Sequence, residues 1–188
     1  LFRSIFAILF IIVVLKNGHF LTSGGLGVAT QVSAPILMVA LGQSLVLNIG
    51  SIDLSNAALS LLGAIILATT LPHLGDFSPI AILILTTIFG AVNGLLVAYT
   101  KAPSFALTLG TLGIFQTASL VISKATSVYV NNNDAFLGHL NNNTLLTIPL
   151  IFYVGVILAI ILWGVLKFTS PGRNMTAVGL NETATIYA

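Results

Sequence analysis

The sequence predicts an all-α, polytopic transmembrane helical bundle, and three observations support this. Apolar residues fill 57% of its 188 positions, charged residues fill only 5%, and the mean hydropathy is +1.11. A soluble domain carries about 25% charged residues, because its surface must face water. The apolar residues also form long continuous runs, separated by clusters of turn-forming residues. Lipid must therefore solvate most of this chain.

The apolar runs define six predicted spans. A helix rises about 1.5 Å per residue, so about 20 residues cross the hydrocarbon of a bilayer. Continuous apolar runs favour helices over a β-barrel, whose strands alternate apolar and polar residues. The spans lie at residues 1–15, 28–49, 57–71, 80–99, 105–122 and 145–168. The first and third are short, so we expect a trimmed start and a broken or tilted third element.

Polar breaks separate these spans. Residues 16–19, 72–76, 101–103 and 169–172 each interrupt an apolar run with glycine, proline or charged residues, which favour turns. The longest break, residues 123–143, contains two runs of three asparagines. Lipid cannot solvate so many amide groups, so we expect this loop to be aqueous.

The basic residues predict the orientation, because cytoplasmic loops carry an excess of lysine and arginine. With the N-terminus inside, the cytoplasmic side holds four basic residues and the outer side two: Arg3, Lys101, Lys167 and Arg173 against Lys16 and Lys124. The asparagine-rich loop would then face outward. The N-terminus and residues 169–188 would lie in the cytoplasm, beneath the inner or plasma membrane.

Several functional classes are excluded. The net charge of +2 gives no surface for nucleic acid, and the chain has no cysteine for disulfides, thiolate metal sites or nucleophiles. Its three histidines lie in predicted loops without the spacing of zinc ligands. No phosphate-binding loop or nucleophile elbow occurs. We therefore expect no catalytic residue, no metal and no cofactor on this chain.

Asp53 is the most informative single residue. It lies in the polar segment between the second and third predicted spans. A carboxylate at membrane depth is unfavourable and marks a functional site by default. The alternative is a helix N-cap, in which the carboxylate accepts the free amide hydrogens of the next helix. The sequence favours the cap, and the two roles are compatible.

Other polar side chains lie within or beside the apolar spans. They could line a translocation path for a polar solute, or they could tie neighbouring helices together, which is the commoner use of such groups. The candidates are Gln43, Asn48, Asn93, Thr108, Thr111 and Gln116. The structural role is favoured for each, and the path is kept as the alternative.

The order of these motifs resembles the ribose-type permease family of bacterial ATP-binding cassette importers. Residues 52–55 read Ile-Asp-Leu-Ser after the second span, residues 93–97 resemble the fourth-span motif of that family, and residues 105–111 resemble its fifth-span opening. The segment after the sixth span matches the cytoplasmic coupling element at Gly172, Arg173, Ala177, Gly179, Asn181, Glu182 and Ala184. Four motifs in family order cover nearly the whole chain.

The resemblance implies what the intact subunit does. Residues 1–188 would form part of a single permease domain of about ten spans, in contact with the lipid bilayer. The coupling segment at residues 169–188 would dock on cytoplasmic ATP-binding subunits. A second permease copy and an extracytoplasmic solute-binding protein would complete the importer of a sugar-like or related polar solute. ATP would bind to the partner subunits and not to this chain.

Three alternatives remain open from the sequence. An ion-gradient-driven secondary transporter would also need a membrane carboxylate such as Asp53, although this class usually carries repeated broken spans. A structural membrane anchor would not need small and amide residues within its spans. The segment at residues 169–188 could also be an ordinary loop that leads to the next span.

Overall fold

The computed structural model describes residues 2–100, 102–130, 135–181 and 185. Its elements are α1 (Phe2–Lys16), α2 (Ser23–Asn48), α3 (Asn56–Leu74), the short 3-10 helix η1 (Gly75–Phe77), α4 (Ser78–Thr100), α5 (Ser104–Ser123), α6 (Ala135–Asn142), β1 (Thr144–Leu145), β2 (Ile148–Pro149), α7 (Leu150–Phe168) and α8 (Ser170–Leu180). The predicted polytopic helical bundle is confirmed.

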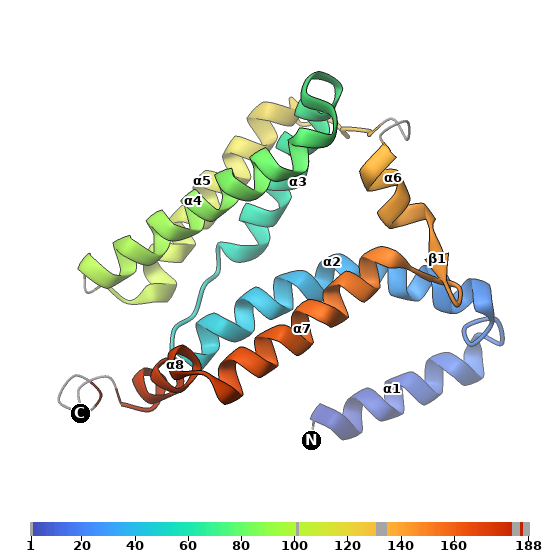
Figure 1. Cartoon of the computed structure of the whole chain (residues 1–188), viewed down its shortest axis with the longest axis horizontal. Coiled ribbons are helices and arrows are strands. Elements are labelled where there is room, and N and C mark those ends of the chain that lie inside the picture. The colour runs from blue at the N-terminus through green and yellow to red at the C-terminus, as the bar shows by residue number, and fades with distance from the viewer. Residues whose placement is uncertain (1, 101, 131–134, 182–184, 186–188) are drawn as a thin grey trace.

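The described residues contain four apolar stretches that are long enough to cross a membrane: Ser23–Asn48, Asn56–Thr100, Ser104–Ser123 and Leu150–Phe168. The second of these holds two helices, because the chain reverses at η1 and α4 runs back along α3 (Figure 1). The helix α1 has 15 residues and is shorter than a full crossing. The first five predicted spans correspond to α1, α2, α3, α4 and α5, and the sixth overlaps α7.

The sixth predicted span begins five residues too early. Residues 144–149 form a two-stranded antiparallel hairpin in place of the first helical turn, and the hairpin turns at Leu146 and Thr147, which have positive φ angles. Proline restricts the residue before it to extended backbone, so Ile148 is held in a strand and α7 begins after Pro149. The preceding loop also contains α6, which the sequence analysis did not predict.

The helices α3, α4 and α5 form one group with its own small core. Ala58 and Leu62 of α3 are buried against Phe115 of α5. The ring of Phe115 also lies 5.8 Å from the ring of Phe89 on α4, measured between centroids. The helices approach closely at Gly63 of α3, where an added Cβ would stand 3.0 Å from a methyl group of α4. Small residues promote such packing in membranes, where lipid is as apolar as the helices.

The helices α2 and α7 form a second group and run side by side in the same direction (Figure 1). Gly155 of α7 is buried against Leu37 of α2. The polar segment between α2 and α3 joins this pair to the three-helix group. Large apolar side chains remain exposed along α1, α2, α4, α5 and α7. In a multi-pass membrane protein these exposed side chains face lipid or further protein.

Candidate translocation cavity and coupling helix

The entry to α3 is built around Asp53. One of its carboxylate oxygens, Oδ1, accepts hydrogen bonds from the amide and from the hydroxyl of Ser55, both at 2.7 Å. Ser55 is fully buried and is the N-cap residue of α3, but its side chain makes no capping bond. The Asp53 side chain therefore closes an Asx turn with the backbone of Ser55, two residues later. The N-cap interpretation of Asp53 is wrong, because its carboxylate does not reach the first helical turn.

Asn93 ties three helices together. Its side-chain nitrogen, Nδ2, donates to the Ser55 hydroxyl at 2.8 Å and to the Thr111 hydroxyl at 3.1 Å. The side chain of Asn93 is buried on α4, while Ser55 begins α3 and Thr111 lies on α5. A buried amide must find such partners, because leaving it unpaired in hydrocarbon is unfavourable. The predicted role in helix association thus applies to Asn93 and Thr111.

Hydroxyl groups of α5 hold the backbone that leads to Asp53 and Ser55. Ser104 Oγ accepts a hydrogen bond from the amide of Ile52 at 3.1 Å, and Thr108 Oγ1 accepts one from the amide of Leu54 at 3.1 Å. The Thr108 hydroxyl also lies 2.8 Å from the carbonyl oxygen of Ser104. This segment has no regular secondary structure, so α5 supplies partners for backbone groups that would otherwise be unpaired.

A cavity of about 760 Å³ opens beside this network. Its polar lining comes from Ser51, Asp53, Asn93, Ser104 and Thr108, and its other lining residues are apolar or small. Within the described part of the chain, the second oxygen of Asp53 and the side-chain oxygen of Asn93 accept no hydrogen bond. Both of these acceptors belong to residues that line the cavity.

The helix α8 contributes Val178 to the lining of the same cavity. It follows α7 after a sharp corner, at which Gly172 is buried against the backbone of Val165 and Leu166. The Thr169 hydroxyl caps α8 by accepting a hydrogen bond from the amide of Gly172 at 3.4 Å. Within the predicted coupling segment, residues 170–180 form the helix α8.

The matched residues of the coupling segment have different surroundings. Gly179 faces the backbone of α2, so its small size serves a contact within the chain. Arg173 is exposed and donates a hydrogen bond to Ser170 Oγ at 3.0 Å, while Ala177 is partly buried. Asn181 ends α8, and its amide bonds to the carbonyl of Ala177. Glu182 and Ala184 lie outside the described residues.

Four predicted path residues do not line the cavity. Gln43 is partly buried in α2, and Gln116 is exposed on α5. The side chain of Asn48 bonds to Thr176 of α8, and the hydroxyl of Thr111 bonds to Asn93. Ser55 and Ser104 also belong to the site, although the sequence did not indicate this. Ser55 could have been found, because it is the last residue of the Ile-Asp-Leu-Ser motif.

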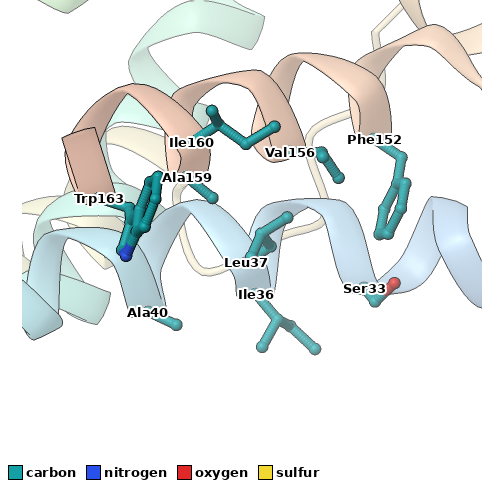
Figure 2. A pocket seen from close by; sticks show the side chains of 9 residues that line it. All are labelled: Ser33, Ile36, Leu37, Ala40, Phe152, Val156, Ala159, Ile160 and Trp163. Atoms are coloured by element: carbon teal, nitrogen blue, oxygen red, sulfur yellow. The ribbon is translucent and has the colours of Figure 1, made fainter.

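A second cavity, of about 570 Å³, lies between α2 and α7 (Figure 2). Its lining is almost entirely apolar and comes from both helices, with Ile36 and Leu37 on α2 and Val156, Ile160 and Trp163 on α7. A polar solute would find almost no hydrogen-bond partner there. The cavity beside Asp53 is therefore the better candidate for a translocation path.

Comparison with known proteins identifies several similar permeases. The chain is 32% identical to the D-allose transport system permease protein of Escherichia coli over 93% of this chain and 54% of the relative. It is 29% identical to the ribose import permease protein of Haemophilus influenzae, over 97% of this chain and 58% of the relative. It is 33% identical to the autoinducer 2 import system permease protein of Salmonella typhimurium, over 79% of this chain and 43% of the relative.

The chain spans about half the length of these relatives. No solved structure matches it significantly. Residues 26–188 match the family model described as branched-chain amino acid transport system, permease component. This match covers most of α2 and all of α3 to α8, and it includes the residues that line the cavity beside Asp53. The chain therefore belongs to the permease component family of branched-chain amino acid transport systems.

Proposed function

We propose that the full-length protein is the membrane permease subunit of an ATP-driven importer for a sugar-like or related polar solute. An extracytoplasmic binding protein would deliver the solute, and cytoplasmic ATP-binding subunits would supply the energy. The main support is that the cavity lined by Asp53 and Asn93 is also lined by Val178 of α8. A single cavity thus adjoins both the polar network and the segment expected to meet the ATP-binding subunits.

The chemistry of the cavity suits a solute rich in hydroxyl groups. The unpaired oxygens of Asp53 and Asn93 can accept hydrogen bonds from such a solute. Among the described residues, those that line the cavity include no basic side chain to balance an anion. The names of the similar permeases mention D-allose, ribose and autoinducer 2, which we take as the solutes to test first.

The cytoplasmic partners would meet α8. Arg173 is exposed near the beginning of this helix, where it can pair with an acidic group on another subunit. We expect a second permease copy beside this one, and ATP bound only to the partner subunits. The N-terminus and α8 would face the cytoplasm, as the basic residues predict.

Uptake by the complete complex tests this proposal. The full-length permease, its ATP-binding subunits and its binding protein are reconstituted in liposomes with radiolabelled D-allose or D-ribose. We expect uptake to require ATP and the binding protein, and we expect Asp53→Asn to alter KM for the solute. Asp76→Asn is the matched control, because Asp76 lies in η1 and does not line the cavity.

Two outcomes would contradict the proposal. Uptake that is driven by an imposed ion gradient and needs no ATP would indicate a secondary transporter. Equal KM values for Asp53→Asn, Asp76→Asn and the unmodified protein would show that the Asp53 carboxylate does not contact the solute.

A further inference from the structure

The backbones of α2 and α8 touch at two glycines. Gly50 follows the C-terminal end of α2 with φ of 75°, and an added Cβ there would stand 3.3 Å from the carbonyl oxygen of Gly179. A Cβ on Gly179 would overlap the carbonyl oxygen of Asn48 and lie 3.2 Å from the amide nitrogen of Gly50. No side chain fits between these two segments, so they are in direct backbone contact.

A side-chain hydrogen bond lies next to this backbone contact. Asn48 Nδ2 donates to Thr176 Oγ1 at 3.2 Å, and Thr176 precedes Gly179 by three residues, about one helical turn. We call Asn48, Gly50, Thr176 and Gly179 the α2–α8 latch. The latch therefore combines a close backbone contact with a polar bond, on consecutive turns of α8.

The latch lies at the beginning of the segment that carries Asp53. Residues 51–55 start directly after Gly50 and contain both Ser51 and Asp53, which line the polar cavity. Val178 of α8, next to Gly179, lines the same cavity. Only two residues separate Gly50 from Asp53, so a shift of the latch changes the path of the chain at the cavity wall.

We propose that the α2–α8 latch transmits movements of α8 to the Asp53 segment and thereby changes the shape of the polar cavity. This inference rests on the proposed function, in which ATP-binding subunits move α8. A contact between two glycine backbones is stiff, because no side-chain rotamer can absorb a displacement. Thr176 and Gly179 are thus positioning residues that act on the cavity through Gly50.

A thiol reporter in the cavity measures this transmission without a transported solute. The 188 residues contain no cysteine, so S51C gives one reactive thiol in this part of the full-length permease. The permease is assembled with its ATP-binding subunits in lipid nanodiscs. The rate of alkylation at S51C by a small maleimide is then measured without nucleotide and with MgATP and vanadate.

We expect nucleotide to change the alkylation rate by about fivefold or more, as is typical for coupled sites. In the S51C background, Gly179→Ala and Thr176→Ala should remove most of this change, whereas Thr176→Ser should retain it. Asn174→Ala is the matched control, because Asn174 is an exposed residue of α8 that makes no latch contact. In this control, nucleotide should change the alkylation rate at S51C as much as it does when the latch is unmodified.

The outcomes separate this inference from the proposed function. If the ATP-binding subunits do not assemble with the unmodified permease, the proposed function fails and the inference fails with it. If they assemble and hydrolyse ATP but the rate at S51C does not change, only the inference is wrong. An unchanged nucleotide response in both Gly179→Ala and Thr176→Ala would also overturn it. Thr176→Ala removes a side-chain group without adding volume, so it remains informative if Gly179→Ala does not fold.

Discussion

Replacing Ser55 with alanine tests the polar network that joins α3, α4 and α5. Ser55 is fully buried, and its hydroxyl donates to Asp53 at 2.7 Å and accepts from Asn93 at 2.8 Å. The substitution removes one oxygen atom, so it leaves little empty volume and isolates the two hydrogen bonds. Asp53 keeps its bond from the Ser55 amide, and Asn93 keeps its bond to Thr111.

The expected loss follows from these two bonds. A side-chain hydrogen bond between membrane helices contributes on average about 0.6 kcal/mol. A bond to a charged group contributes about 1.5–3 kcal/mol in soluble proteins. We therefore expect Ser55→Ala to lower the free energy of unfolding by roughly 1–3 kcal/mol. Reversible unfolding of the full-length permease in mixed detergent micelles, followed by circular dichroism, measures this loss.

Ser60→Ala is the matched control on the same helix. Ser60 is exposed, and its hydroxyl bonds to the carbonyl of Ala57 within α3 rather than to another helix, so its loss should stay below about 0.5 kcal/mol. Equal stabilities of the two alanine variants would refute the network as a source of stability. Combining Ser55→Ala with Asn93→Ala should give a coupling of about 0.6 kcal/mol, and strictly additive losses would contradict a direct bond.

Three further predictions concern packing and orientation. Gly63→Leu should lower the free energy of unfolding by about 1–3 kcal/mol, because a methyl group of α4 lies 3.0 Å from an added Cβ. Gly110→Leu is the control, because Gly110 has open space around it, and it should have little effect in the same unfolding assay. Gly172→Leu should displace α8 from the end of α7, and limited proteolysis should then cut the corner between them faster than in Gly110→Leu. N132C should react with an impermeant thiol reagent from outside the cell and T176C only after the membrane is opened; the opposite pattern would reverse the predicted orientation.

Much of the helical architecture could be predicted from the sequence, because lipid imposes long apolar helices and polar breaks mark their ends. The start of α7 could not be predicted in this way. The residues before Pro149 are apolar enough to belong to a span, and only the backbone restriction at that proline converts them into a hairpin. Helix α6 was also missed, because its sequence is short and rich in asparagine.

The sequence could predict which polar residues belong to the site, but not which of them lie together in the fold. The sequence identified Asp53, Asn93 and Thr108 as polar residues in apolar surroundings, and the fold brings them to one cavity. It could not tell these residues from Gln116, because helical rotation decides whether an amide faces a neighbouring helix or the exposed surface. The role of Gly179 was also hidden, since its neighbour in space, Gly50, lies far away in the sequence.

Cross-linking at α8 tests most directly whether a cytoplasmic ATP-binding subunit contacts this helix. Arg173 is exposed on α8, and R173C places one thiol there in a segment that has no native cysteine. F6C places a thiol on the exposed surface of α1 as the control. We predict that a short thiol-reactive cross-linker joins R173C, but not F6C, to the ATP-binding subunit in native membranes. Equal cross-linking at both positions, or none at R173C in an active transporter, would contradict the account.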